Sequence, residues 1–130
     1  MTTTAAAVVE ELGARFRAGD LESARALYAP GIRLQQPASL PHGGWHEGLA
    51  GMDAMAKVFA EHWDRAITAS QVHDAGVALA VQVTTQTWTA KSTGKAATVD
   101  VIELITVEQG LVTEIRVFQQ DTHALLATLA

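Results

Sequence analysis

Apolar residues in the first part of the chain recur every three or four positions, which is the period of a helix that packs on one side. This period predicts a first helix that ends near Gly19, and a second that begins after Asp20 and ends before Pro30. The apolar positions of these two helices are Val8, Leu12, Phe16, Leu21, Ala24, Leu27 and Tyr28.

A third helical pattern follows a segment rich in proline and glycine, residues 37–50. An irregular connection of this length is uncommon in a compact domain and often forms a lid or a binding loop. Trp45 within this segment would supply an apolar group that covers a pocket. The alternative is a static loop at a dimer contact. The third helix would carry Met52, Met55, Phe59 and Trp63 on one side.

The rest of the chain changes to the alternation of apolar and polar residues that is typical of strands. Strands are predicted at about residues 32–36, 67–74, 77–89, 98–107 and 111–120, with a last short helix at 123–129. Helices followed by a meander of strands predict an α+β fold, in which N-terminal helices pack on one face of a curved antiparallel sheet. The 130 residues are predicted to form one domain, residues 1–130.

One face of the predicted strand 77–89 mixes small, polar and aromatic residues. Its members are Ala78, Ala80, Gln82, Thr84, Gln86 and Trp88. We expect this row on the outer face of the sheet, where it would pack against a second subunit. The sequence therefore predicts a homodimer.

An acidic residue, Asp121, follows the last strand and would share a side with Ile115 and Val117 if the alternation continues. A carboxyl group that faces an apolar cavity resists ionisation and can serve as an acid or a base near neutral pH. The alternative is structural, because aspartate is a favoured N-cap residue and the predicted helix 123–129 follows directly. Both roles could hold together.

A second acidic residue, Glu103, stands in an otherwise apolar row of a strand. That row is Val99, Val101, Glu103, Ile105 and Val107. Burial would raise the pKa of Glu103, and the protonated acid could donate to a developing oxyanion. The alternative places Glu103 at the edge of the sheet, paired with Arg33 or Arg116.

Other aromatic and polar residues would suit a pocket for a small, flat, apolar molecule. The candidate binding residues are Gln36, Tyr28, Trp45, His46, Trp63 and Phe59. Tyr28 would offer a hydroxyl, and His46 or His42 would act at the pocket mouth. Core packing is the alternative for Phe59 and Trp63, and a position on a surface loop is the alternative for the histidines.

Composition narrows the function further. The net charge is −5 and the nine Lys and Arg residues are scattered singly, so we expect neither nucleic acid nor a membrane as a partner. There is no cysteine, and none of the five histidines forms a zinc-binding helical pair, so no metal and no cofactor are expected. No apolar run approaches a membrane span, and residues 1–7 lack the parts of a signal peptide, so a cytoplasmic protein is expected.

Several short fragments, in their order and spacing, resemble the nuclear-transport-factor-2-like superfamily and most closely its SnoaL-like branch. The fragments are Ala18-Gly19-Asp20-Leu21, Leu27-Tyr28-Ala29, Gln36-Pro37, Gly48 and Phe118 through Asp121-Thr122. The resemblance covers nearly the whole chain and implies a cone-shaped fold with a deep apolar pocket. The superfamily includes ketosteroid isomerases, polyketide cyclases, dehydratases, epoxide hydrolases and binding proteins, so the site must decide the function.

The resemblance to ketosteroid isomerases fails at two of three positions. Gln36 stands where that family has its catalytic aspartate, and Leu12 stands where it has its oxyanion-hole tyrosine. Only Glu103 is similar, because it corresponds to the oxyanion-hole acid. An amide cannot take a proton from carbon, so we do not expect a conventional ketosteroid isomerase.

The resemblance to SnoaL-like cyclases implies an acid/base role for Asp121, since they carry an aspartate at the end of the last strand. The spacing from Gly110 to Asp121 is one residue longer than usual, so a bulge would decide where Asp121 points. Epoxide hydrolases of the superfamily use an Asp-Arg-Asp set. Arg116 lies near the corresponding strand, and the second aspartate has no evident counterpart.

We therefore expect an enzyme that uses acid/base chemistry to cyclise, isomerise, dehydrate or hydrolyse a polyketide-like or polycyclic metabolite. Asp121 would be the acid/base group, and Glu103 or Gln36 would polarise the substrate. Two alternatives remain: a ligand-binding domain of the same fold without turnover, and an enzyme similar to epoxide hydrolases.

Overall fold

The computed structural model describes residues 3–130. Met1 and Thr2, part of the segment expected to be no signal peptide, lie outside the described residues. The helices are α1 (Ala5–Arg17), α2 (Leu21–Arg25), α3 (Gly48–His62) and α4 (Thr122–Ala127). The strands are β1 (Tyr28–Gln36), β2 (Gly44–Glu47), β3 (Trp63–Asp74), β4 (Leu79–Ala90), β5 (Ala96–Glu108) and β6 (Leu111–Gln119). In this part of the chain no helix is long and apolar enough to cross a membrane.

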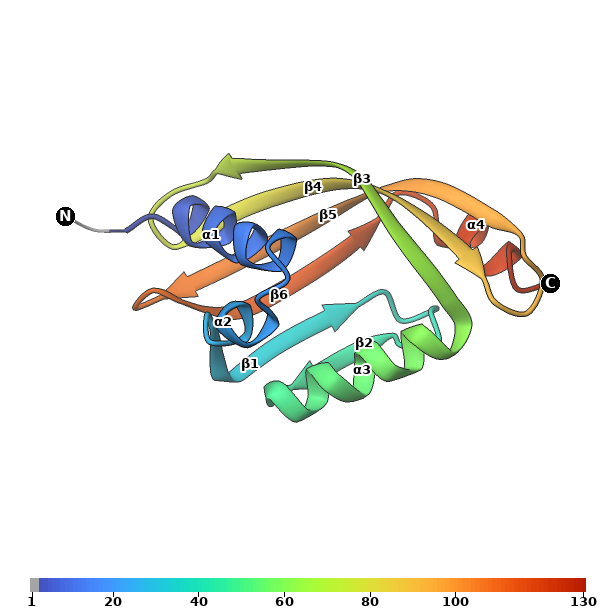
Figure 1. The fold of residues 1–130 in the computed structure, drawn as a ribbon, viewed down its shortest axis with the longest axis horizontal. Coiled ribbons are helices and arrows are strands. Elements are labelled where there is room, and N and C mark those ends of the chain that lie inside the picture. The colour runs from blue at the N-terminus through green and yellow to red at the C-terminus, as the bar shows by residue number, and fades with distance from the viewer. Residues whose placement is uncertain (1–2) are drawn as a thin grey trace.

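The strands form one curved, open sheet in the order β2-β1-β6-β5-β4-β3, with the helices on one side (Figure 1). Neighbouring strands are antiparallel except β1 and β6, which are parallel. The sheet's inner, concave face carries α1 and α2 at one end, α3 runs beside β1 and β2, and α4 lies at the other end. The predicted α+β fold is confirmed.

The helix ends follow local capping chemistry. The Thr4 hydroxyl accepts a hydrogen bond from the Ala7 N–H (3.2 Å), which pairs a free donor of the first turn of α1. Gly19 adopts a positive φ of 74° directly after α1, a conformation that favours glycine at a helix end. Asp20 caps α2, as predicted, since its carboxylate accepts from the Ser23 N–H (3.1 Å).

Three predicted boundaries are wrong. Tyr28 begins β1 and does not belong to the second helix, because it already pairs with Val112 of β6. Trp63 begins β3, where it pairs with Ala90, so it does not extend α3. Residues 37–50 are not one irregular loop, since they contain β2 and the first residues of α3.

The mixed row of β4 lies on the inner face of the sheet, so its predicted role as a contact with a second subunit is wrong. Ala80, Thr84, Gln86 and Trp88 are 0–4% exposed within the single chain. Their polar groups pair with each other: the Gln86 amide donates to the Thr84 hydroxyl (2.8 Å) and accepts from the Trp88 indole (2.8 Å). Polarity in this row therefore signals an internal network, not an exposed surface.

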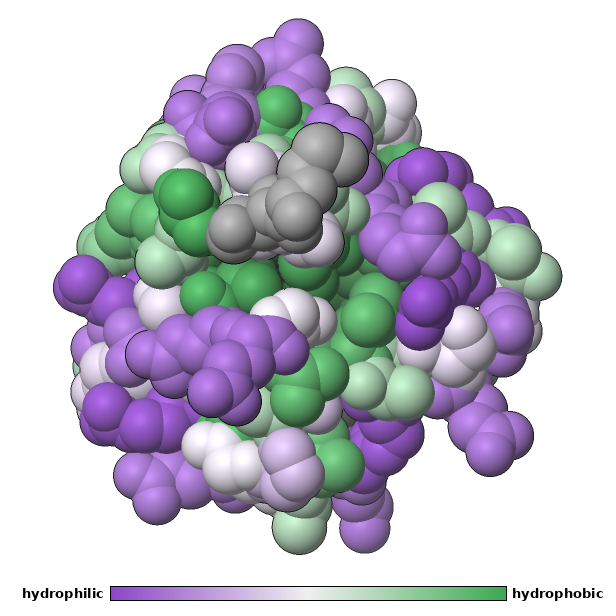
Figure 2. All heavy atoms as spheres, turned by 90° about the vertical axis from the view of Figure 1, so that its left-hand side faces the viewer, coloured by the Kyte–Doolittle hydropathy of each residue, from purple (hydrophilic) through white to green (hydrophobic). Residues whose placement is uncertain are grey.

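The end of the inner face beneath α1 is filled with aliphatic side chains. Val8, Val9 and Leu12 of α1 belong to the same buried cluster as Ile105 and Val112. Seen from this end, apolar residues gather at the centre and hydrophilic residues surround them (Figure 2). This dry half of the core fixes the sheet on which the other half is built.

Candidate functional site

The other half of the inner face encloses a small cavity of about 40 Å³ near α3. Six of its ten lining residues carry polar side chains. The lining residues are Gln36, His42, Phe59, Arg65, Gln86, Trp88, Val101, Glu103, Val117 and Gln119. A space of this size admits a few atoms of a ligand and not a whole polycyclic molecule. The deep apolar pocket expected from the resemblance is thus a smaller, more polar cavity.

Strand register explains why these residues meet. Glu103 of β5 lies opposite Gln82 of β4 and Val117 of β6, so its side chain is on the inner face with theirs. Gln119 lies opposite Val101 in the same way, and Arg65 of β3 lies opposite Trp88. Because side chains alternate between the two faces of a strand, residues from four adjacent strands converge on one cavity.

Burial raises the pKa of the Glu103 carboxyl above its ordinary value, because the surrounding protein disfavours the charged form. The positive charge of Arg65 acts in the opposite direction and is the weaker influence. The pKa of Glu103 is therefore nearer to neutral pH than the pKa of an exposed glutamate. This is the property that a general acid or base requires near neutral pH.

His42 is almost fully buried, with 3% of its surface exposed, in a tight turn between β1 and β2. Its ring contacts three aromatic rings: Phe59 at 5.3 Å, Trp88 at 5.8 Å and Trp63 at 6.0 Å between centroids. Desolvation lowers the pKa of His42 to about 4, assisted by the charges of neighbouring basic groups. The ring is therefore neutral at pH 7.

Two features hold the turn that carries His42. The His46 ring is hydrogen-bonded through Nε2 to the His42 carbonyl oxygen (2.8 Å). A Cβ added at Gly43 would lie 2.4 Å from the Pro37 carbonyl oxygen, so only glycine fits there. The turn thereby keeps the His42 ring against the aromatic cluster.

Three buried polar atoms have no hydrogen-bond partner among the described residues: Gln36 Oε1, His42 Nδ1 and Gln119 Oε1. All three belong to residues that line the cavity. Buried polar atoms are normally paired, and an unpaired one costs about 1–3 kcal/mol. Their common position leaves three hydrogen-bonding positions open at one cavity.

Three of the candidate residues from the sequence line this cavity: Glu103, Gln36 and Phe59. Trp63 packs behind it in the core, where its indole donates to the Thr128 hydroxyl (2.8 Å). Tyr28 is not a lining residue, although burial, and then the charge of Glu103, raise the pKa of its hydroxyl to about 12.

Asp121 lies outside the cavity, which contradicts the expectation that it shares a buried face with Ile115 and Val117. It is exposed, and its carboxylate accepts from the Ala124 N–H (3.0 Å) as the N-cap of α4. β6 ends at Gln119, which takes the inner-face position instead. The geometry matches the capping alternative.

Trp45 and His46 also lie away from the cavity. Trp45 is in β2 opposite Gln35, is 42% exposed, and packs beneath the Arg33 guanidinium at 4.3 Å on the outer face of the sheet. The expectation that Trp45 covers the pocket is therefore wrong in this structure. His46 supports the turn of His42 from the inner side.

The sequence did not identify Arg65, Gln86 or Gln119 as site residues, and it named His42 only as an alternative to His46. Gln119 follows the alternation of Ile115 and Val117, so parity along β6 could have found it. No comparable signal marks His42 or Arg65, because their positions depend on the turn and on the start of β3. Among the described residues no three His, Asp or Glu side chains come together to hold a metal ion.

A larger groove of about 500 Å³ lies at the ends of β1 and β6, with the outer-face residues Trp45, Arg116 and Phe118 in its wall. Arg116 is the only charged side chain among its lining residues, and no carboxyl or imidazole group lines it. Proton transfer near neutral pH needs such a group. The smaller cavity, which has both a carboxyl and an imidazole group, is therefore the candidate site.

Solved structures with the same fold are numerous. An NTF2-like protein from Burkholderia xenovorans LB400 is 26% identical, with a TM-score of 0.80 over 95% of this chain and 93% of that one. An NTF2-like protein from Burkholderia thailandensis E264 is 22% identical, with a TM-score of 0.87 over 99% of both chains. TerC, co-crystallised with polyporic acid, is 20% identical, with a TM-score of 0.80 over 94% of this chain and 95% of that one.

Among curated proteins no sequence matches this chain. The SnoaL-like domain family matches residues 9–115, which is most of the chain and includes the cavity residues from Gln36 to Glu103. The protein is therefore a member of the SnoaL-like family, within the nuclear-transport-factor-2-like superfamily.

Proposed function

We propose that this protein is a small-molecule enzyme in which Glu103 transfers a proton inside the inner cavity. One observation supports it above the others: a carboxyl group with a raised pKa shares this cavity with three unpaired polar atoms. Such a combination of a perturbed acid and open hydrogen-bonding positions is typical of a reaction site.

The chemistry follows from the two protonation states of Glu103. As a carboxylate it takes a proton from a carbon next to a carbonyl group, and as the resulting acid it returns that proton to another atom. Return to a second carbon is an isomerisation, return to a departing hydroxyl is a dehydration, and return to the carbonyl oxygen after ring closure is a cyclisation. The Oε1 atoms of Gln36 and Gln119 would accept hydrogen bonds from substrate hydroxyl groups, and the neutral His42 would donate to the carbonyl oxygen in the tautomer that carries the proton on Nδ1.

The substrate class is a polyketide-like or polycyclic molecule whose reactive end enters the cavity. Phe59 and Trp88 offer aromatic walls, with ring centroids 4.8 Å apart in an edge-to-face arrangement. The cavity volume of about 40 Å³ limits entry to the reacting group. TerC, a protein of the same fold, was co-crystallised with polyporic acid, so polyporic acid is tested for binding beside the panel described next.

The test compares variants at two carboxylates of the protein. Each variant is given a panel of planar hydroxylated aromatic ketones and β-diketones, and turnover is followed by absorbance and mass spectrometry. Glu103→Gln should lower turnover by about 10²–10⁴-fold and leave binding intact. Asp121→Asn is the matched control, because asparagine also caps a helix well. Loss of turnover in Asp121→Asn with full activity in Glu103→Gln would refute the proposal.

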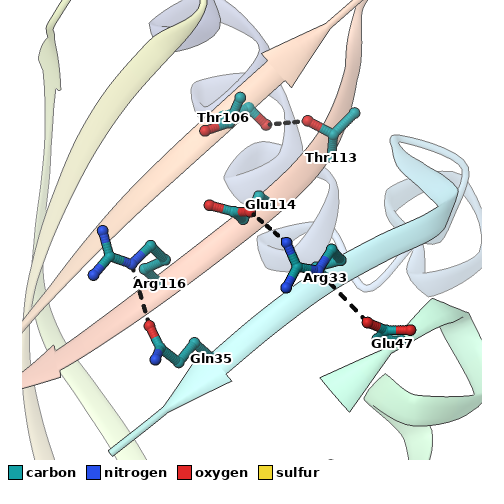
Figure 3. Close-up of polar contacts among 7 residues, drawn as sticks. All are labelled: Arg33, Gln35, Glu47, Thr106, Thr113, Glu114 and Arg116. Carbon is teal, nitrogen blue, oxygen red and sulfur yellow. Dashed lines mark hydrogen bonds and ion pairs between the residues drawn. The ribbon is translucent and has the colours of Figure 1, made fainter. Parts of the chain in front are cut away.

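The second candidate is a ligand-binding domain without turnover, and the unpaired polar atoms support it equally. It predicts tight binding of panel members with no product in the wild type. The epoxide-hydrolase alternative has less support: Arg116 lies on the outer face, where it donates to the Gln35 side chain (3.2 Å), so it does not meet Glu103 (Figure 3).

We also propose a homodimer through the outer face, with residues other than those first expected. Ile102 (42% exposed) and Phe118 (44% exposed) are neighbours in β5 and β6 on this face. Beside them Arg33 lies between Glu114 (3.5 Å) and Glu47 (3.6 Å), so these charges pair within the chain (Figure 3). Exposed apolar residues of this size often mark a protein contact.

A further inference from the structure

Arg65 is the one Lys or Arg among the residues that line the cavity, and it lies two residues after the start of β3. The residue lies opposite Trp88 on the inner face, and its guanidinium carbon is 5.2 Å from the centroid of the Phe59 ring. The same side chain lines the cavity while remaining exposed to solvent. Arg65 thus stands at the mouth of the cavity, with one side toward water and the other toward Glu103.

The charge of Arg65 has no carboxylate partner among the described residues. Three other arginines have such a partner, for example Arg15 with Glu11 at 2.9 Å and Arg25 with Asp53 at 2.7 Å. Arg17 and Arg116 also lack one within the described part of the chain, but neither of them lines the cavity. Glu103 shares the cavity with Arg65, yet burial still outweighs the arginine and shifts this carboxyl toward its neutral form. No ion pair joins Glu103 to Arg65 among the described residues.

The unpaired atoms of the cavity need hydrogen-bond donors, whereas Arg65 needs a negative charge. The Oε1 atoms of Gln36 and Gln119 can only accept hydrogen bonds, and they have no donor among the described residues. The Nδ1 atom of the neutral His42 also lacks a partner there. A ligand that satisfies these atoms brings hydroxyl groups to the inner end of the cavity.

We propose that the cavity is selective for a planar acid that carries a carboxylate and a hydroxyl group on neighbouring carbons of one edge, so that only this edge enters, with the carboxylate on Arg65 and the hydroxyl group donating to Gln36 or Gln119. Phe59 and Trp88 line the same cavity and offer aromatic contacts to the edge that enters. The guanidinium offers paired N–H donors that match the two oxygens of a carboxylate. This inference rests on the cavity of the proposed function and names the class of compound that it takes.

The test uses 3-hydroxy-2-naphthoic acid, which has both groups on one edge, its amide, which keeps the shape and removes the charge, and 2-naphthoic acid, which lacks the hydroxyl. Binding is measured by NMR titration or calorimetry at pH 7. Wild type should bind the hydroxylated acid about tenfold more tightly than either comparison compound, since a charge-assisted hydrogen bond is worth about one decade in affinity.

Arg65→Met keeps an unbranched side chain beside Phe59 and should abolish the preference for the acid over the amide. Arg65→Gln serves as the second variant if Arg65→Met does not fold, and Arg17→Met on α1 controls for the loss of one positive charge. Equal binding of acid and amide by wild type, no binding of the acid, or a preference that survives in both Arg65 variants would overturn the proposal.

The outcome is separable from that of the proposed function. Turnover of neutral ketones through Glu103, without selective binding of acids, would refute only the role of Arg65. Selective binding of acids through Arg65 with no turnover of any compound would support this inference and refute the enzyme.

Discussion

The two ends of the concave face carry different kinds of side chain, although the same strands supply the inner positions at both ends. Beneath α1, the inner positions of β4, β5 and β6 are aliphatic, for example Ala80, Ile105 and Val112, each 0–1% exposed. Toward α3, the inner positions of the same strands include Gln86, Glu103 and Gln119. The backbone is alike at both ends, so the side chains alone make one end a core and the other a candidate site.

The comparison indicates how the fold tolerates a costly cavity. Burying the Glu103 carboxyl and leaving three polar atoms unpaired both oppose folding. Close packing at the dry end favours folding, because each buried aliphatic side chain contributes about 1.5–3 kcal/mol. Stability and ligand chemistry are therefore assigned to different ends of one sheet, and substitutions can separate them.

The largest expected effect is at the dry end. Val112→Ala should lower the free energy of unfolding by about 2–3 kcal/mol, because it removes two buried methyl groups and leaves a void in the packed cluster. Urea denaturation followed by circular dichroism measures the change. Ligand affinity, measured where the variant remains folded, should stay within about twofold of wild type. A large loss of affinity with little loss of stability would show that the two ends are not separate.

The converse substitution should make the polar end resemble the dry end. Glu103→Leu removes a buried carboxyl and keeps a similar volume, so it should raise the free energy of unfolding at pH 7 by roughly 1 kcal/mol. The same variant should lose turnover completely. Destabilisation by Glu103→Leu would contradict the comparison, since it would mean that the carboxyl contributes to packing or pairing at this end.

Much of the fold followed from periodicity, because long regular segments average over many residues. The alternation in β5 placed Glu103 on a buried face, and Gly19 and Asp20 marked the boundary between the first two helices. The mixed row of β4 was assigned to the wrong face. Its polar residues satisfy each other inside the protein, and a one-dimensional pattern does not contain such partners.

The site was harder to predict for a related reason. Asp121 looked like a continuation of β6, but the strand ends at Gln119 and the carboxylate turns back to cap α4. Residue types alone could not decide between a cap and a buried acid, since both suit aspartate. His42 depends on a tight turn at Gly43, which long-range contacts with three aromatic rings stabilise.

Two residues at the polar end should respond to pH in opposite directions. The folded protein raises the pKa of Glu103, so its contribution to stability is fully present below the unfolded value, about 4.3, and is lost as pH rises through the folded value. The folded protein lowers the pKa of His42 to about 4, so its contribution is present above the unfolded value, about 6.5, and is lost as pH falls toward 4.

Unfolding of wild type, Glu103→Gln and His42→Asn between pH 4 and pH 7 measures both effects. Wild type should lose stability relative to Glu103→Gln as pH increases, and relative to His42→Asn as pH decreases. Dry-end variants such as Val112→Ala should show the pH dependence of wild type. If stability changes with pH in the same way in all the variants, then folding does not shift the pKa of either group.

The smallest effect on the cavity is expected from Trp45→Ala, which changes the opposite face of the sheet. The indole lies in β2 against Arg33 and lines the outer groove, and it is not among the residues that line the cavity. Affinity for a cavity ligand should therefore remain within about twofold of wild type, as expected for distant, independent sites.

If the outer face forms the homodimer, sedimentation equilibrium should show weaker self-association for Trp45→Ala, and much weaker self-association for Phe118→Glu, because a buried charge opposes contact. A cavity ligand whose affinity falls by tenfold or more in Trp45→Ala, with self-association unchanged, would instead connect the groove to the cavity through Gln36 and Gln119, the polar residues that line both.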